Sequence, residues 1–257
     1  MNLFVFDIET VPDIELGKKI YQLDGLNDDD VAKVLFTKQR QKTGSEFLPH
    51  YLHQIVAISI VFKTKQTTKV WSLGSLESTE AELIQRFYDG VDKYQPTLVS
   101  WNGGGFDLPV LHYRGLKHGV DASRYWDQGE LDRDYKWNNY VNRYHSRHTD
   151  LMDVLAGFQP RANASLEHIA LMLGFPGKLG MSGASVWPAY HDGRLQDIRN
   201  YCETDVLNTY LVYLRWELIR GNLDQAGFDN ATEELRAVLA GMNRDHLNEF
   251  VKAWDNS

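Results

Sequence analysis

The stretch that decides the fold is NLFVFDIETVPD, residues 2–13. Its unbroken apolar run, residues 3–6, is typical of a central strand that is covered on both faces. Two carboxylates follow this run. Because strand side chains alternate between faces with period two, Asp7 and Glu9 are expected to point to the same side of the sheet. Ile8 is expected to point to the opposite side, together with the two phenylalanines before it.

Two acids side by side at the end of a buried strand are energetically costly. Like charges on neighbouring positions of one face repel, and partial burial raises the cost of each charge. The ordinary explanation of an Asp-x-Glu pair is a solvated strand end, since acids prefer the surface. The apolar run before Asp7 favours burial instead. We therefore expect a positively charged group between Asp7 and Glu9.

The composition is that of a folded globular protein, with 257 residues, 43% hydrophobic and 12% aromatic. No apolar run approaches the roughly 20 residues of a membrane helix. The N-terminus leads directly into a strand, so no secretory signal is expected. The single cysteine, Cys202, excludes an intramolecular disulfide and a cysteine-based zinc cluster. These features predict a soluble cytoplasmic protein that does not bind a membrane.

The net charge of −8 bears on possible partners. A broad basic surface is the usual sign of phosphate binding, and an acidic chain does not favour one. Divalent cations held by carboxylates reverse the local field, however. The acidic balance therefore leaves metal-dependent chemistry on phosphates open.

Hydrophobic periodicity and turn residues give the order of elements. The pattern predicts strands at 54–62, 68–73 and 96–101, and helices at 28–43, 79–94, 106–119, 165–175, 193–221 and 231–253. Ser165 is the expected cap of the helix at 165–175. Residues 121–147 lack clear periodicity and read as a mobile loop or an insertion. We expect one α/β domain over residues 1–257 with a mixed sheet, and a C-terminal helical extension at about 222–257.

A third acid follows a predicted strand and a glycine turn. Three glycines at 103–105 remove side chains where the backbone bends sharply or a ligand approaches, and Asp107 comes two residues later. Asp107 also fits the N-cap of the next helix, with Pro109 in its first turn. Asp150, which follows His148 at a probable strand start, is an alternative to Asp107 as a site residue.

The long helix at 193–221 carries a fourth acid. Tyr201 and Asp205 are four residues apart and share one helical face. Beside them runs an apolar stripe that should pack on the sheet: Cys202, Val206, Tyr210 and Tyr213. An acid at the border of such a stripe is usually a solvated edge residue.

Three short motifs are more informative together, in their order along the chain, than each motif is alone. FDIET (6–10), NGGGFD (102–107) and YCETD (201–205) resemble the three exonuclease motifs of the DEDD superfamily of 3′–5′ exonucleases, in its tyrosine-containing DEDDy branch. The similarity is strongest to the stand-alone exonucleases related to the proofreading domain of family-B DNA polymerases, and it covers most of residues 1–220. It implies a ribonuclease-H-like mixed sheet of five to six strands flanked by helices. It also implies a 3′–5′ exonuclease that releases nucleoside monophosphates from single-stranded DNA 3′ ends.

The resemblance also assigns roles to the motif residues. It implies two divalent metal ions, Mg²⁺ or Mn²⁺, bridged by Asp7. Glu9 and Asp205 would complete the metal on the side of the nucleophile, and Asp107 would hold the other. Tyr201 would orient the attacking water, because a pKa near 10 makes tyrosine a poor base at neutral pH. Since the carboxylates repel one another, we expect weak metal binding until a scissile phosphate arrives.

The resemblance further implies that Asn102 and Phe106 contact the terminal nucleotides, with Phe106 stacking on or wedging between bases. A core position is an equally good interpretation of Phe106. The segment 124–147 interleaves aromatic and basic residues, which suits a single-strand groove. The four acids that it also carries favour a structural insertion.

Two other function classes stay open at this point. An exoribonuclease would use the same carboxylates, and no motif here reads the sugar 2′-hydroxyl that separates RNA from DNA. A non-catalytic nucleic-acid-binding module is less favoured, because all four acids and the tyrosine are present. There is no Gly-x-Ser-x-Gly sequence for a serine hydrolase. His145 and His148 have no cysteine partners for a zinc site.

Overall fold

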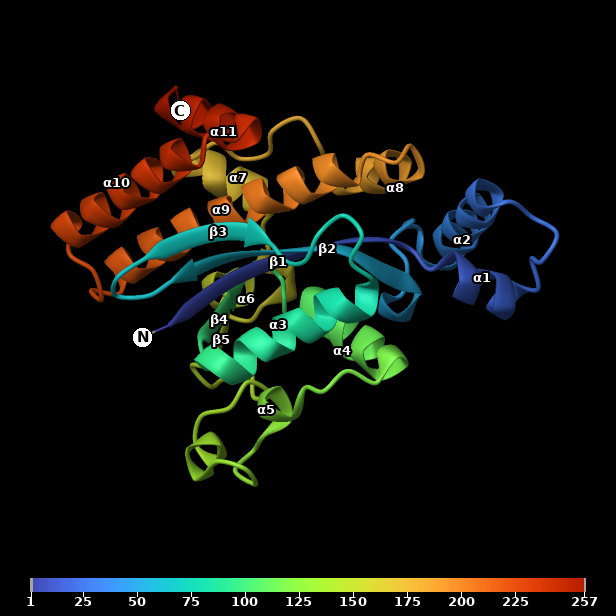
Figure 1. The fold of residues 1–257 in the computed structure, drawn as a ribbon, viewed down its shortest axis with the longest axis horizontal. Helices are drawn as coiled ribbons and strands as arrows, with labels where there is room; N and C mark the ends of the chain where they lie inside the picture. The colour runs from blue at the N-terminus through green and yellow to red at the C-terminus, as the bar shows by residue number, and fades with distance from the viewer. Residues whose placement is uncertain (1, 257) are drawn as a thin grey trace.

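A mixed five-stranded sheet forms the centre of the protein (Figure 1). The structure is a computed structural model, and it describes residues 2–256. The strands lie in the order β3-β2-β1-β4-β5, with β1 antiparallel to β2, β2 antiparallel to β3, and β1, β4 and β5 parallel. Their bounds are β1 (Leu3–Pro12), β2 (His53–Lys63), β3 (Thr68–Ser72), β4 (Thr97–Ser100) and β5 (His148–Asp150). The predicted combination of a parallel part and an antiparallel hairpin is confirmed.

Helices cover both faces of this sheet. The α-helices are α1 (Ile14–Tyr21), α2 (Asp28–Thr43), α3 (Glu80–Tyr94), α4 (Asp107–His118), α5 (Ser123–Trp126), α6 (Leu151–Leu155), α7 (Leu166–Met172), α8 (Gly183–His191), α9 (Leu195–Ile219), α10 (Gln225–Met242) and α11 (Asp245–Asp255). In Figure 1, α3 and α4 lie on one side of the sheet, α9, α10 and α11 on the other, and α1 and α2 beyond one end of it. Short 3₁₀ turns are η1 (His50–Leu52), η2 (Arg133–Lys136) and η3 (Pro160–Ala162).

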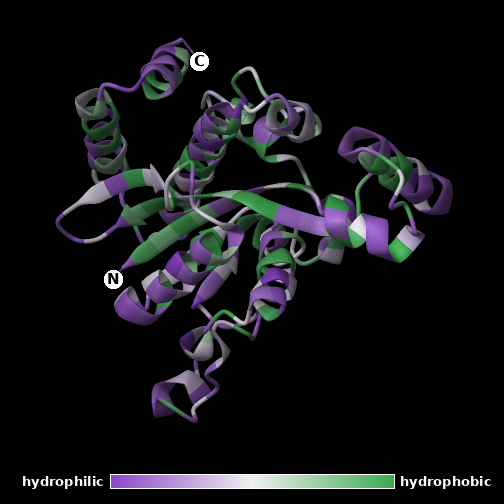
Figure 2. Ribbon diagram, turned by 45° about the vertical axis from the view of Figure 1, so that its right-hand side comes forward, coloured by the Kyte–Doolittle hydropathy of each residue, from purple (hydrophilic) through white to green (hydrophobic). Residues whose placement is uncertain are grey.

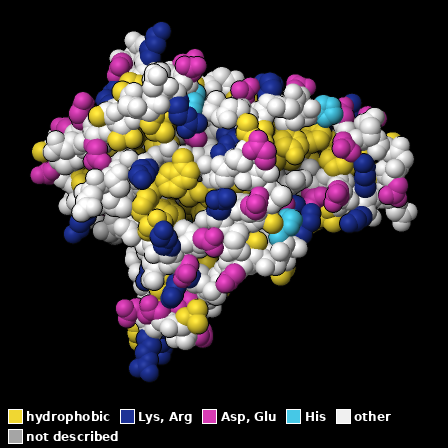
Figure 3. All heavy atoms as spheres, viewed as in Figure 1, with side chains coloured by type: hydrophobic (Ala, Val, Ile, Leu, Met, Phe, Trp, Pro, Cys, Tyr) yellow, Lys and Arg dark blue, Asp and Glu magenta, His cyan; other side chains and the backbone are white. Residues whose placement is uncertain are grey.

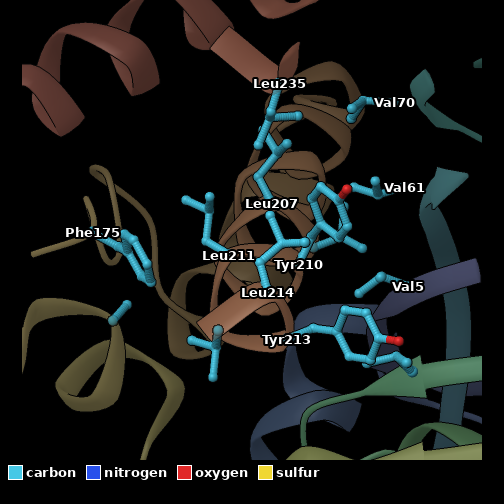
Figure 4. Close-up of a cluster of buried hydrophobic side chains, with 14 of the residues drawn as sticks. Val5, Val61, Val70, Phe175, Leu207, Tyr210, Leu211, Tyr213, Leu214 and Leu235 are labelled. Atoms are coloured by element: carbon cyan, nitrogen blue, oxygen red, sulfur yellow. The ribbon is translucent and has the colours of Figure 1, made fainter. Parts of the chain in front are cut away.

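The core on the α9 side joins four strands, β1 to β4, to α9 and to residues of α6, α7, α10 and α11. Figure 4 shows Val5, Val61 and Val70 of the strands facing Tyr210 and Tyr213 of α9. The whole predicted stripe of α9 is buried, as expected for a helix that packs on a sheet. α9 is buried on its outer side as well, because α7, α8, α10 and α11 pack against it. The helix that carries Tyr201 and Asp205 is therefore held rigidly between two layers.

The opposite face of the sheet packs on α3 and α4. Phe4, Phe6 and Ile8 belong to this second core, with Ile84 and Phe87 of α3. Figure 2 shows hydrophobic colour along the strands and hydrophilic colour on the outer turns of the helices. The alternation expected for β1 is confirmed.

Most predicted helices agree with the structure, and the last one is wrong. Ser165 caps α7 by accepting a hydrogen bond from the His168 N–H at 3.2 Å, although α7 ends at Met172 rather than at 175. The single helix predicted at 231–253 is two helices. Asn243 adopts a left-handed backbone conformation with φ of 49°, which ends α10 before α11 begins. Asn is one of the few residues that tolerate this conformation at a helix end.

Residues 121–147 form a lobe that extends away from the sheet around α5 (Figure 1). Three of its tyrosines, Tyr125, Tyr135 and Tyr140, are buried and join the core that α3 and α4 form with the sheet. The Arg147 guanidinium lies 3.9 Å from the centre of the Tyr135 ring, and Asp127 accepts hydrogen bonds from backbone N–H groups at residues 129–132. Many of the aromatic and charged side chains of this segment therefore stabilise the lobe and its contact with the neighbouring core.

Within residues 2–256, no helix combines the length and the apolar character needed to cross a lipid bilayer.

Candidate active site

The central strand carries the first two acids to the α9 side of the sheet. Glu9 is 8% exposed, and Asp7 is partly buried beside it. Their neighbours on β2 are small, with Ser59 opposite Asp7 and Ala57 opposite Glu9. The register slips immediately after this point, because Thr10 pairs with Ile55 and one residue of β2 is left over as a bulge. Small neighbours leave space above the two carboxylates.

The glycine turn brings Asp107 to the same place. Asn102 has a left-handed φ of 62°, and a Cβ on Gly103 would lie 2.5 Å from the Ser100 Cβ, so this tight turn needs glycine. Asp107 is the first residue of α4. The N-cap interpretation of Asp107 is wrong, since Phe106 occupies that position. Asp107 Oδ1 instead accepts a hydrogen bond of 3.1 Å from the Ile8 N–H, between the two acids of β1.

Asp150 has a different environment. Its two carboxylate oxygens accept hydrogen bonds of 2.9 Å from the N–H groups of Asn102 and Gly104. It also caps α6 through the Met152 N–H, at 3.1 Å. Asp150 therefore holds the glycine turn in shape. Of the two candidates left open by the sequence, Asp107 is the one that lies among the other acids.

α9 supplies the remaining two groups. Asp205 is 7% exposed and Tyr201 is 5% exposed, so neither is a solvated edge residue. The Tyr201 hydroxyl lies close enough to the Asp205 carboxylate to lower the pKa of Asp205, and Asp205 in turn raises the pKa of Tyr201. Asp205 Oδ1 is buried and has no hydrogen-bond partner among the described residues. An unpaired buried carboxylate oxygen is expensive unless a ligand satisfies it.

The pKa values of the four acids show that they share one environment. Burial raises the pKa of Asp7 well above its ordinary value, and the charges of Asp107, Glu9 and Asp205 raise it further. Burial, Asp205 and Asp107 do the same for the pKa of Glu9. Burial raises the pKa of Asp107 to about 7 and that of Asp205 to about 6. Such upward shifts mark carboxylates without enough positive charge nearby.

Lys178, which sequence reasoning missed, is a nearby cation. Its charge acts to lower the pKa of both Glu9 and Asp205, and its Nζ lies 5.7 Å from the centre of the Tyr201 ring. Lys178 lies in the irregular segment between α7 and α8, where one lysine in a loop carries no sequence signal. Only the folded chain places it at the acids.

These residues fit a divalent metal. Hard cations such as Mg²⁺ and Mn²⁺ take carboxylate oxygens, and this pocket offers four carboxylates with one oxygen unpaired. Ligand atoms of Asp7, Glu9 and Cys202 lie within 4.8 Å of one another. A bound cation would supply the positive charge that the sequence predicted between Asp7 and Glu9.

A cleft of about 770 Å³ opens beside Glu9. Phe106 forms part of its wall, half-buried, with its ring centre 5.2 Å from that of Phe47 and 5.0 Å from that of His53. α8 contributes Trp187 to the same cleft. Neither Phe47 nor Trp187 was singled out from the sequence, because isolated aromatics outside any motif look like core residues.

Charges of both signs are interspersed over the face drawn in Figure 3, including the lobe at 121–147. This view contains no large surface of a single sign. A broad basic surface, which the acidic net charge does not favour, is not visible on this face.

Comparisons with known proteins agree on one family. A family model described as a predicted 3′–5′ exonuclease related to the exonuclease domain of PolB matches residues 45–254. The DNA polymerase epsilon catalytic subunit from Saccharomyces cerevisiae is 26% identical over 147 residues, which is 54% of this chain and 6% of that protein. The protein of the same name from Emericella nidulans is 25% identical over 150 residues, with the same coverage.

The family B DNA polymerase from the archaeon Pyrobaculum calidifontis has a similar fold. Its structure gives a TM-score of 0.52 at 16% sequence identity, covering 85% of this chain and 24% of the polymerase. This chain thus spans only a small part of the polymerases that it matches. The likeness supports the predicted ribonuclease-H-like arrangement of a mixed sheet between helices.

The matched range contains Asp107, Tyr201 and Asp205, and it begins after β1, so Asp7 and Glu9 lie before it. It also contains the lobe at 121–147 and extends through α10 into α11. The match covers well over half of the chain and agrees with the fold. The chain therefore belongs to the family of predicted 3′–5′ exonucleases related to the exonuclease domain of PolB.

Proposed function

We propose that this protein is a metal-dependent 3′–5′ exonuclease that removes nucleoside monophosphates from the 3′ ends of single-stranded DNA. The observation that carries the proposal is the convergence of Asp7, Glu9, Asp107 and Asp205, buried and without matching positive charge, beside a cleft. A fold gains nothing from such repulsion. It is explained if dications and a phosphodiester complete the site.

The acids would hold two divalent ions, Mg²⁺ or Mn²⁺. When bound, two such ions activate a water, neutralise the scissile phosphate and stabilise the leaving oxygen of an in-line displacement. Asp7 would bridge them, Glu9 and Asp205 would bind on the side of the attacking water, and Asp107 on the other side. The hydrogen bond that Asp107 Oδ1 accepts from the Ile8 N–H keeps the Asp107 carboxylate in a fixed orientation.

Tyr201 would position the water rather than deprotonate it. Burial and the charges of Asp205 and Glu9 raise the pKa of its hydroxyl above the ordinary value of 10. The hydroxyl therefore keeps its proton at neutral pH and acts as a hydrogen-bonding group. Its position beside Asp205 on the same face of α9 would place it next to the bound metal.

Phe106 and Asn102 would contact the terminal nucleotides. Phe106 lies on the wall of the cleft next to Glu9, where a base could stack on its ring. Aromatic–base stacking contributes roughly 1–3 kcal/mol per base and does not depend on sequence. Asn102 starts the turn that leads to Phe106, so both side chains belong to one short segment.

Two further points follow from the comparisons. The curated relatives are DNA polymerase subunits, which favours DNA over RNA as the substrate. The family match runs from residue 45 to residue 254, and β1 lies in the middle of the sheet. We therefore assign residues 1–257 to one exonuclease domain that includes the 121–147 lobe and the C-terminal helices.

The test uses matched DNA and RNA oligonucleotides, each labelled at the 5′ end or at the 3′ end, with Mg²⁺ or Mn²⁺. We expect 5′-labelled DNA to shorten stepwise from its 3′ end, with little change in RNA. Shortening from the 5′ end would refute the polarity, and faster RNA degradation would indicate an exoribonuclease. Activity that survives the double substitution Asp7→Ala and Asp205→Ala would show that the active site lies elsewhere.

A further inference from the structure

Cys202, the one cysteine of the chain, lies among the proposed metal ligands, and the hydrolytic mechanism does not use it. It belongs to α9, one residue after Tyr201, and is fully buried. Its Sγ lies 3.6 Å from Asp7 Oδ2 and 3.4 Å from the Asp7 backbone oxygen. Asp7, Glu9 and Cys202 each offer an atom to a common space less than 4.8 Å across.

The spacing of these atoms suits a tetrahedral ion. Zinc binds thiolate sulfur at about 2.3 Å and carboxylate oxygen at about 2.0 Å, which places two such ligands roughly 3.5 Å apart across a tetrahedral angle. The distance between Asp7 Oδ2 and Cys202 Sγ is 3.6 Å. The two side chains therefore need little movement to share one ion.

A fourth donor is available in the same pocket. Asp205 is 7% exposed and its Oδ1 has no hydrogen-bond partner in the described chain. The charge of Asp205 raises the pKa of both Asp7 and Glu9, so its carboxylate lies near them. Asp205 lies outside the cluster of ligand atoms that Asp7, Glu9 and Cys202 form within 4.8 Å, and by turning its unpaired oxygen toward them it would complete a tetrahedral set of three carboxylates and one thiol.

We propose that Asp7, Glu9, Asp205 and Cys202 form a binding site for a thiophilic divalent cation of the Zn²⁺ or Cd²⁺ class, overlapping the hydrolytic metal site. Binding forms a metal–sulfur bond and releases the thiol proton to solvent, with no change in oxidation state. Mg²⁺ and Mn²⁺ prefer oxygen and would leave the thiol protonated. The inference rests on the proposed metal site, and it adds a ligand and a metal class to it.

The site has a functional consequence. Structural zinc sites with four protein ligands are closed, whereas catalytic sites keep one position open for water. A thiophilic ion held by Cys202 would occupy Asp7 and leave no open position for the attacking water. Zn²⁺ and Cd²⁺ should therefore inhibit by displacing the hydrolytic ions.

The test is a titration of the metal-free protein with Cd²⁺, followed by ultraviolet absorbance of the thiolate-to-cadmium charge-transfer band. Because the chain has a single cysteine, one band per protein molecule reports Cys202 alone. We expect the band in the unmodified protein and its loss in Cys202→Ala and Cys202→Ser. In both variants Cd²⁺ affinity should fall roughly tenfold or more, while Mn²⁺ affinity changes less than about twofold.

Tyr201→Phe is the matched control, since it removes a neighbouring polar atom of α9 that is no ligand in this set. It should keep the cadmium band and the Cd²⁺ affinity. Absence of the band in the unmodified protein, or equal Cd²⁺ affinity in the two cysteine variants, would overturn the inference. Circular dichroism of both variants checks that they fold.

Failure of this inference can be told apart from failure of the proposed function. An active exonuclease without a cadmium band refutes only the role of Cys202. A cadmium band in a protein without nuclease activity refutes only the proposed function.

Discussion

β1 and the residue after it, Asp13, place buried acids in two regions of the molecule. In one region the chain supplies enough cations to balance the acids, and in the other it does not. Asp7 and Glu9 enter a pocket that contains two more acids. Asp13, just beyond the strand, meets Arg114 instead, and both of these side chains are 2% exposed. Arg114 also binds Glu80 through its Nε, with an N–O distance of 2.7 Å, and Lys117 reaches Asp13 at 2.8 Å. We call Asp13, Glu80, Arg114 and Lys117 the Arg114 network.

The pKa values of the two regions move in opposite directions. Burial by itself would raise the pKa of Asp13, but hydrogen bonds from Arg114 and Lys117 lower it to about 2. In the pocket of four acids, burial acts alongside neighbouring acids, and the pKa values of Asp7 and Glu9 rise well above their ordinary values. The comparison teaches that burial alone does not mark a functional acid. What marks it is burial with too little positive charge from the chain, since Lys178 lowers the pKa of Glu9 and Asp205 without cancelling the upward shift.

The largest effect is expected from Asp7→Asn. In the proposed mechanism Asp7 holds the metal ions, so its loss should remove several kcal/mol of metal-derived transition-state stabilisation, which corresponds to about 10³-fold or more in kcat. The same change removes a repelled charge, so the metal-free protein should be at least as stable as the original. The measurements are nuclease rate with Mg²⁺ and urea unfolding in EDTA.

Asp13→Asn tests the other region, the Arg114 network, in which the chain itself supplies the cations. It leaves Arg114 short of a partner, so stability should fall, while kcat per folded molecule stays within a few-fold. If Asp13→Asn abolished catalysis in a protein that remained folded, the division between a structural and a functional acid region would be wrong.

Arg114→Met tests the Arg114 network directly. Removing one partner of a buried ion pair leaves an uncompensated charge and costs about 3–5 kcal/mol. Here both Asp13 and Glu80 would lose their buried ion-pair partner, although Lys117 still contacts Asp13 and His118 still contacts Glu80. Urea unfolding near pH 7 measures the loss. A change below about 1 kcal/mol would mean that solvent reaches this network more easily than its burial indicates.

The two regions also differ in how far sequence alone could predict them. Asp7, Glu9, Asp107 and Asp205 stand in short motifs whose order along the chain carries the information, and strand periodicity placed the first two on one face. The Arg114 network has no such signal. Its members come from the end of β1, the start of α3 and the end of α4, and only the packing of those elements brings them together.

The remaining misses have the same origin. Lys178 and Phe47 reach the site from loops, and Trp187 reaches it from α8, so their contacts depend on tertiary packing. The break between α10 and α11 falls at Asn243, a residue type that tolerates the left-handed conformation, but one asparagine within a continuous helical pattern does not by itself mark a helix end. Both helices pack against α9.

The free energy of unfolding of the metal-free protein, measured at a series of pH values, distinguishes the two regions, because raised and lowered carboxyl pKa values change it in opposite directions. Burial raises the pKa of Asp107 from 3.8 to about 7, so the folded state holds its proton more tightly than the unfolded state does. This group favours folding below pH 4, and the benefit is lost as pH rises through 7. Asp107→Asn removes this pH-dependent loss of stability. In EDTA at pH 8 the variant should be more stable by about 2–4 kcal/mol, with no difference at pH 4.

The difference between the two proteins is the quantity to measure. His53, His112 and His148 have pKa values lowered by burial to about 4 and act with the opposite sign over the same range. They are unchanged in Asp107→Asn, so their contribution cancels in the difference. Saturating Mg²⁺ should shrink the difference, because the metal favours the ionised carboxylate. A constant difference from pH 4 to 8 would contradict the raised pKa of Asp107.

The smallest effect is expected from Lys117→Ala. Lys117 contacts the same Asp13 oxygen as Arg114, yet its side chain is 43% exposed, so solvent already stabilises its charge. Exposed ion pairs contribute about 0–1 kcal/mol, and the loss should fall in that range. Adding salt should weaken the effect of Lys117 and leave that of Arg114 nearly unchanged, since screening acts mainly on exposed charges. A loss as large as that of Arg114→Met would show that the positive charge near Asp13, rather than its burial and geometry, decides which acids the fold tolerates.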